Sequence, residues 1–170
     1  MAVRELRIFP DPVLRQACAE IERYDESVAR LLDDLAESMY AHRGVGLAAP
    51  QIGEAVQAMV VDVDQRDGTP RLIEFVNPRV TAASDDLEER EEGCLSFPGE
   101  ADTVRRPRRV TVQAFDRRGQ SFEITAEGLL ATAMQHEIDH LKGKLFVDYL
   151  SRLRRSLLLR RMKKRLRESA

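Results

Sequence analysis

Apolar residues recur at the spacing of an α-helix in three parts of the chain. In the first part, residues 24–40, the recurring positions are Val28, Leu31, Leu32, Leu35 and Met39. Asp25 precedes them as a suitable N-cap, and the helix is expected to end near Gly44. Two further helices are predicted over about 128–141 and about 150–167.

The middle of the chain has the composition of β-strands. Strands are predicted over residues 58–63, 71–77, 104–115 and 120–125. Residues 84–92 are strongly acidic, and we expect them to form a solvated loop. Because the strands are not separated by helices, the pattern predicts an α+β fold.

Residues 44–53 are rich in glycine and are predicted to form a shaped loop. The first six match Gly-x-Gly-x-x-Ala, and Asp64 lies at the distance expected of a dinucleotide-binding fingerprint. That fingerprint requires a strand before the loop and a helix after it, whereas here a helix precedes the loop and Pro50 interrupts any helix after it. We therefore expect the loop to bring backbone amides and the Gln51 side chain next to a reacting oxygen.

Length and composition are those of a globular protein. The chain has 170 residues, of which 43% are hydrophobic and 33% charged, so we expect one domain over residues 1–170. Its longest apolar stretches, such as residues 55–61, are too short to cross a membrane. The two cysteines are far apart and no apolar signal segment is present, so we expect free thiols in a reducing compartment.

The net charge of −2 conceals an uneven distribution. Residues 151–170 hold nine of the 27 basic residues and one of the 29 acidic residues. For the basic helix within residues 152–167, two interpretations stay open. It is either a solvated helix packed on the body of the protein or a contact for RNA phosphate.

Residues 136–140 read His-Glu-Ile-Asp-His within the predicted helix over 128–141. Two histidines four positions apart lie on one face of a helix, so both imidazoles can bind a single metal ion. Glu137 points near the same face and can move protons on a metal-bound water. A chance pair of surface histidines is the alternative, and the apolar helical context disfavours it.

Two histidines leave a catalytic metal one protein ligand short. The candidates are an Asp, a Glu, His42 or a cysteine. Cys94 comes after a glycine that lets the backbone approach a crowded centre, and a thiolate would donate charge to the metal. From spacing alone, Cys94 is equally consistent with a small buried apolar residue. Cys18 lies in a helix-like stretch and is assigned to the core, and His42 to the surface or to the surroundings of the metal.

Three motifs together resemble those of the peptide deformylase family. They are Gly44-Val-Gly-Leu-Ala-Ala-Pro-Gln51, Glu92-Gly-Cys-Leu-Ser96 and Gln135-His-Glu-Ile-Asp-His-Leu141. They occur in the family's order and at similar separations, and the similarity extends from Pro10 to Leu150. The continuation into a basic helix resembles the form found in many Gram-negative bacteria and in organelles.

The resemblance implies mixed or antiparallel sheets packed around a central metal-binding helix, with helices at both ends of the chain. It implies a hydrolase that removes the formyl group from the N-terminal methionine of nascent polypeptides through a metal-bound hydroxide. The metal ligands would be Cys94, His136 and His140, and Glu137 would be the general base and acid. The metal would be one divalent ion, Fe²⁺ in the cell, with Zn²⁺ or Ni²⁺ often found in isolated protein.

The resemblance also assigns substrate contacts. The Gln51 side chain and the Leu95 backbone N–H would hold the oxyanion, and the Gly46 carbonyl would hold the substrate amide. The residues that would shape or border the methionine pocket are Val45, Glu92, Leu129, Thr132 and Ala133. Two positions depart from the family pattern: Phe97 replaces a smaller aliphatic residue and Thr132 replaces an often apolar one.

Arg106 and Asp139 could orient a ligand histidine, because metal ligands usually need an outer hydrogen-bond partner. A surface ion pair explains the same two residues equally well from the sequence alone. The resemblance also implies a monomer, and ribosome contact through residues 152–167.

Two other functions remain as alternatives. A zinc endopeptidase would use the same His-Glu-x-x-His motif, but a cysteine ligand is unlike most such proteases. An RNA-binding module with a vestigial metal site is disfavoured by the intact Glu137, Gln51 and Cys94. The lack of a basic, serine-rich leader favours a bacterial cytoplasm, or a processed form in an organelle.

Overall fold

The computed structural model describes residues 2–65 and 68–169. Its α-helices are α1 (Glu26–Ala41), α2 (Gly128–Leu141) and α3 (Arg152–Glu168). Short 3-10 helices lie at Pro12–Arg15, Ala49–Ile52 and Phe146–Tyr149. The Asp25 side chain accepts a hydrogen bond from the Ser27 N–H and caps α1, as predicted.

The strands form two antiparallel sheets within the described residues. The larger sheet has the order β1-β2-β3-β6-β7, built from Gly46–Ala48, Ala58–Val61, Ile73–Ala83, Arg109–Phe115 and Ser121–Glu127. The smaller sheet is a hairpin of β4 (Leu87–Gly93) and β5 (Ala101–Pro107). The fold is therefore α+β, in agreement with the sequence pattern.

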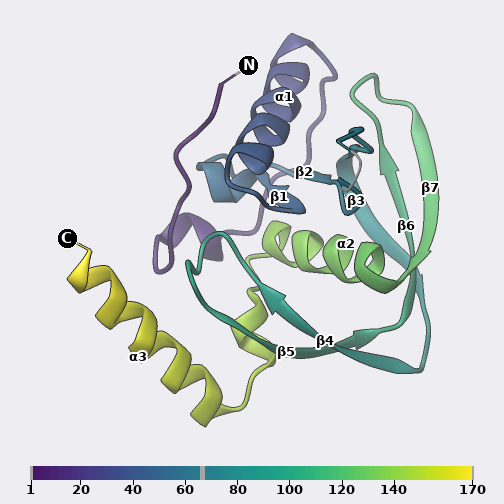
Figure 1. Ribbon diagram of the computed structural model, residues 1–170. Coiled ribbons are helices and arrows are strands. Elements are labelled where there is room, and N and C mark those ends of the chain that lie inside the picture. The colour runs from purple at the N-terminus through teal and green to yellow at the C-terminus, as the bar shows by residue number, and fades with distance from the viewer. Residues whose placement is uncertain (1, 66–67, 170) are drawn as a thin grey trace.

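Helix α2 lies at the centre of the molecule, between the five-stranded sheet and the β4–β5 hairpin (Figure 1). Its apolar side chains pack in one core cluster with Met59, Val61 and Phe75 of the sheet. Helix α1 covers the opposite face, where its apolar side chains meet Val60 and Val76. Successive side chains of strand β2 point to opposite faces of the sheet. All four are buried, because α2 covers one face and α1 the other.

The acidic segment over residues 84–92 is a strand in most of its length, so the prediction of a solvated loop is wrong. Two of its glutamates lie opposite arginines of β5, Glu88 opposite Arg106 and Glu89 opposite Arg105. Opposite charges on neighbouring strands offset the poor strand propensity of glutamate. The charge pattern of residues 84–92 alone could not show that they pair with the arginines of β5.

Two other predicted boundaries are wrong. The single strand expected over 104–115 is two strands in different sheets, divided at Pro107, because proline cannot donate to a continuing ladder. The glycine-rich loop over 44–53 contains the edge strand β1 and a 3-10 helix. Cys18 is buried as expected, but it lies in an extended segment beside Ala19, which bridges to Val56, rather than in a helix.

Helix α3 packs against the rest of the protein through one narrow apolar face. Leu158 and Met162 are buried in a cluster with Phe97 and Phe146, whereas Leu153 is 68% exposed. The Ser151 hydroxyl accepts a hydrogen bond from the Arg154 N–H and caps the helix. No helix among the described residues is both long and apolar enough to cross a membrane.

Candidate metal centre and active-site cavity

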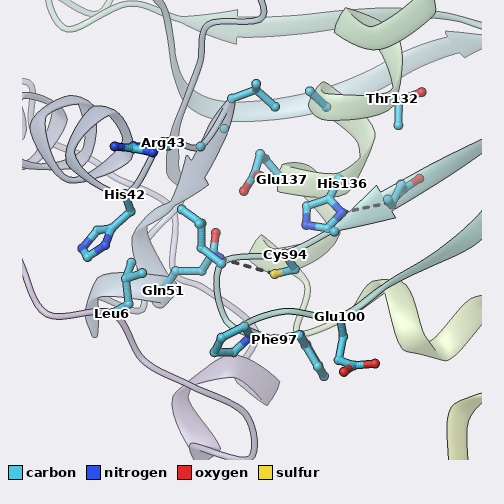
Figure 2. Close-up of a pocket in the computed structure, with 18 of the residues that line it drawn as sticks. Leu6, His42, Arg43, Gln51, Cys94, Phe97, Glu100, Thr132, His136 and Glu137 are labelled. Carbon is cyan, nitrogen blue, oxygen red and sulfur yellow. Dashed lines mark hydrogen bonds and ion pairs between the residues drawn. The ribbon is translucent and has the colours of Figure 1, made fainter. Parts of the chain in front are cut away.

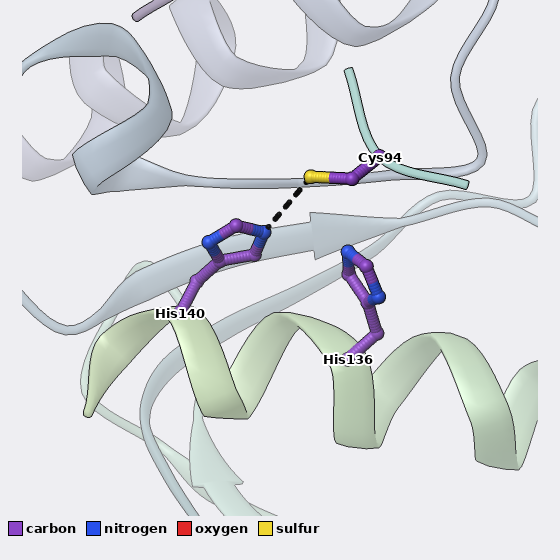
Figure 3. Close-up of side chains that lie close together, drawn as sticks. All are labelled: Cys94, His136 and His140. Atoms are coloured by element: carbon purple, nitrogen blue, oxygen red, sulfur yellow. Dashed lines mark hydrogen bonds between the residues drawn. The ribbon is translucent and has the colours of Figure 1, made fainter. Parts of the chain in front are cut away.

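Three ligand-type side chains converge from two parts of the chain. Helix α2 supplies His136 and His140 from successive turns, and Cys94 comes from the segment directly after β4. One ligand atom of each residue lies within 4.8 Å of the others. Figure 3 shows Cys94 facing both imidazoles, with its Sγ atom 3.4 Å from Nε2 of His140. The structure thus brings together the three residues that the motifs singled out.

The orientation of His136 is set by a buried carboxylate. Nδ1 of His136 lies 2.9 Å from Oε1 of Glu92, which leaves Nε2 to face the centre. Arg106 holds the same carboxylate through Nε and Nη2, at 2.6 and 2.9 Å. Both side chains are almost fully buried. Burial alone would raise the pKa of Glu92, but hydrogen bonds from Arg106 and His136 hold it below its ordinary value.

Arg106 links this carboxylate to a second acidic residue. Its Nη1 atom donates to Oδ2 of Asp139 at 2.8 Å, and the Tyr149 hydroxyl donates to the same oxygen at 2.7 Å. The guanidinium also lies over the Tyr149 ring, 4.6 Å from its centroid. A continuous network therefore runs from Tyr149 through Arg106 to the imidazole of His136.

Glu137 lies beside the centre and is buried. Burial raises its pKa to about 7, so the carboxyl group can both take up and release a proton near neutral pH. Its Oε2 atom is buried with no hydrogen-bond partner among the described residues. A buried polar atom of this kind is expected where a substrate or water is bound.

Gly46 allows Glu137 to occupy this position. A Cβ atom built on Gly46 would lie 2.8 Å from Oε1 of Glu137, closer than real contacts allow. Strand β1 is the edge of the five-stranded sheet, so its outer backbone groups face this region rather than another strand. The glycine therefore lets an open strand edge pass directly beside the carboxyl group.

The amide of Gln51 is fixed in one orientation. Its Oε1 atom accepts a hydrogen bond from the Ala48 N–H at 3.0 Å. Its Nε2 atom therefore faces the centre and lies 3.5 Å from Cys94 Sγ and 3.2 Å from Ser96 Oγ. The backbone N–H of Leu95 has no acceptor within the described residues. Two donor groups, Gln51 Nε2 and the Leu95 N–H, thus lie beside the three ligand-type residues.

These groups open onto a cavity of about 660 Å³ (Figure 2). Nearly all the residues assigned to the site from the motifs line it: Val45, Gly46, Gln51, Glu92, Cys94, Leu95, Leu129, Thr132, Ala133, His136 and Glu137. His140 is 1% exposed and lies behind them. Glu92 borders the cavity, but its carboxylate is directed to His136 and Arg106. His42 is exposed at the cavity edge, as expected of a surface residue.

The N-terminal segment also builds the site, which the sequence did not indicate. Leu6 and Ile8 line the cavity. The Arg7 N–H donates to the Gln51 carbonyl at 2.7 Å, and the Phe9 N–H donates to the Ser96 carbonyl at 3.0 Å. The segment thus joins the two loops that carry Gln51 and Cys94. Backbone hydrogen bonds between segments that are far apart in the sequence leave no sequence motif. The alternation of apolar residues at Leu6 and Ile8 was a weak indication that one face of this segment is buried.

The sequence and fold of this chain are similar to those of known proteins. The sequence profile of the polypeptide deformylase family matches residues 3–156. The chain belongs to the peptide deformylase family. The peptide deformylase of Azotobacter vinelandii is 46% identical over 168 residues, which cover 99% of each chain. The peptide deformylase of Pseudomonas aeruginosa is 44% identical over 170 residues, the full length of both.

Solved peptide deformylases share the fold. The crystal structure of the Legionella pneumophila protein is similar at a TM-score of 0.92 and 47% identity, covering 99% of this chain and 98% of that one. The Ehrlichia chaffeensis protein, solved in complex with actinonin, gives a TM-score of 0.91 at 37% identity and covers 97% and 98%. The chain is therefore a metal-dependent hydrolase of the family that removes the formyl group from N-terminal methionine.

Proposed function

We propose that this chain deformylates peptides at the centre formed by Cys94, His136 and His140. The observation that carries the proposal is the convergence of these three ligand atoms beside the buried carboxyl group of Glu137. One thiolate and two imidazoles suit Fe²⁺, Zn²⁺ or Ni²⁺, and we assign Fe²⁺ as the ion in the cell. When bound, the ion supplies a Lewis acid that activates water and polarises the formyl oxygen.

Glu137 is the general base and acid in this proposal. Its carboxyl group takes a proton from the attacking water and passes it to the leaving amine. The Gln51 amide and the Leu95 N–H donate to the oxygen on which negative charge develops. Losing one donor of this kind typically costs about 3 kcal/mol of barrier.

The substrate is bound through an open strand edge and an apolar wall. The Gly46 carbonyl on β1 accepts the hydrogen bond of the substrate amide, so the peptide extends the sheet. Val45 and Leu129 are 41% and 42% exposed, which is unusual for large apolar residues that line a cavity. Together with Thr132 and Ala133 they form the pocket for the methionine side chain.

The outer face of α3 is the proposed ribosome contact. Arg154, Arg155, Arg161 and Arg165 pair with acidic residues of the body. Five other basic residues form no ion pair in the part of the chain that the structure describes: Arg152, Arg160, Lys163, Lys164 and Arg167. At helical spacing these five fall within about 120° of one another around the axis. Such a stripe attracts RNA phosphate, and we place the enzyme as a monomer in the bacterial cytoplasm.

The activity is tested by incubating anaerobically purified protein with formyl-Met-Ala and measuring formate. We expect formate from the wild-type protein and a large loss in the Glu137→Ala variant, which should still bind the metal. Internal cleavage of a longer peptide without formate would instead identify an endopeptidase. RNA binding without any turnover would identify a binding module.

A further inference from the structure

The segment after Cys94 forms one wall of the active-site cavity. The Phe97 N–H donates to the Cys94 carbonyl at 2.9 Å, and the Glu100 N–H donates to the Phe97 carbonyl at 3.1 Å, so two turns come directly after the ligand. Residues 97–100 all line the cavity. In Figure 2, Phe97 and Glu100 lie on the side of Cys94 opposite Thr132. This wall therefore lies across the cavity from Thr132, one of the residues that we assign to the methionine pocket.

Helix α3 contacts this wall on the side that faces away from the cavity. The Glu100 carboxylate is only 3% exposed and lies between Arg161 Nη2, at 3.0 Å, and Arg165 Nη1, at 2.7 Å. The same Nη1 atom of Arg165 donates to the Pro98 carbonyl at 2.8 Å. Leu158 and Met162 pack in the same apolar cluster as Phe97. Three kinds of contact thus join α3 to three residues of the wall, Phe97, Pro98 and Glu100.

The local backbone fits this contact closely. Gly99 has φ +77°, and a Cβ atom built on it would lie 2.7 Å from the Arg165 guanidinium. A glycine at this position lets Arg165 reach both Pro98 and Glu100. A buried carboxylate without a cation would be costly, so the two arginines also decide whether Glu100 can stay turned away from the cavity.

We propose that Arg161 and Arg165 are specificity-determining residues of the deformylase, acting through Glu100 and Pro98. The docked helix fixes the position of the cavity wall and neutralises its carboxylate, so it sets which residues are accepted after the formyl-methionine. The proposal rests on the proposed function. The proposal is separate from the proposed ribosome contact, because Arg161 and Arg165 lie on the side of α3 opposite the outer basic stripe.

The test uses two double variants of the full chain, Arg161→Gln/Arg165→Gln and the control Arg160→Gln/Lys164→Gln on the outer stripe. Substrates are formyl-Met-Ala and two amidated tetrapeptides, formyl-Met-Ala-Ser-Lys and formyl-Met-Ala-Ser-Glu. In the first variant, we expect the KM of the tetrapeptides to rise about three- to tenfold, with kcat and the KM of formyl-Met-Ala changed less than about twofold. The control should match the wild type on all substrates.

A charge readout separates specificity from a loss of folding. The unpaired Glu100 should shift the ratio of kcat/KM toward the lysine peptide by about threefold or more, and adding Glu100→Gln should remove that shift. Unchanged KM values and an unchanged ratio in the Arg161→Gln/Arg165→Gln protein would overturn the proposal. If that protein does not fold, Arg165→Gln alone is judged by the same criteria. Formate release by the wild type tests the function independently.

Discussion

At the scale of single residues, the site depends on the hydrogen bonds that orient His136. His136 can present Nε2 to a metal because its Nδ1 atom is engaged by Glu92, and Glu92 is held by Arg106. The carboxylate and the guanidinium are both buried, so neither can exchange its partner for water. The metal affinity of the centre is thus linked to a residue that is not a ligand.

Replacing Arg106 by glutamine should therefore weaken metal binding. We expect the affinity to fall about 10- to 100-fold, because the imidazole loses its fixed orientation. Competition with a chelator, together with metal analysis, measures the change. Breaking a buried pair also costs about 3–5 kcal/mol of stability, so Tyr149→Phe serves as the milder second variant. The matched control is Arg105→Gln on the exposed face of β5, and normal metal content in the Arg106→Gln protein would contradict the prediction.

At the scale of elements, helices were easier to predict than strands and loops. The periodicity of α1 and α2 comes from local contacts, so their positions could be read from consecutive residues. Strand β4 could not, because its glutamates are stabilised by arginines of β5 that a single segment does not reveal. Likewise the contact between Glu92 and His136 joins residues 44 positions apart, and no spacing rule predicts it. The motif still singled out His136 and His140 as candidate ligands, because the two residues lie within one helix.

The docking of α3 can be tested through its apolar face. Leu158→Ala should release the helix, because a buried leucine replaced by alanine loses about 2–5 kcal/mol. The released arginines and lysines should become trypsin sites, and limited proteolysis with mass spectrometry measures the rate of cleavage within residues 152–167. Leu153→Ala, at an exposed position of the same helix, should be cleaved like the wild type. Equal cleavage of the two variants would show that Leu158 does not anchor the helix.

At the scale of the whole molecule, the metal centre joins parts that are distant in the chain. Helix α2, the segment after β4 and the N-terminal segment all meet there, and the candidate metal ligands come from two of the three. A ligand that binds only the folded state raises the stability of that state by mass action. The centre should therefore contribute to global stability as well as to activity.

The melting temperature of the metal-free wild-type protein should lie about 5–10 °C below that of the metal-saturated protein. Differential scanning calorimetry with and without a chelator measures this under anaerobic conditions, which protect the thiolate from oxidation. Glu137→Ala should show the same shift despite its loss of turnover. Cys94→Ala should show little shift, and a full shift in that variant would exclude the thiol as a ligand.

The open edge of β1 has a consequence for resistance to inhibitors. An inhibitor that pairs with the Gly46 carbonyl and the Leu95 N–H uses backbone atoms, which no substitution at Gly46 can delete and which at Leu95 only proline would remove. Escape by substitution is then restricted to the surrounding side chains, and at Gly46 any larger residue collides with Glu137. Compounds that mimic an added strand should therefore lose potency more slowly under selection than compounds that depend on the methionine pocket.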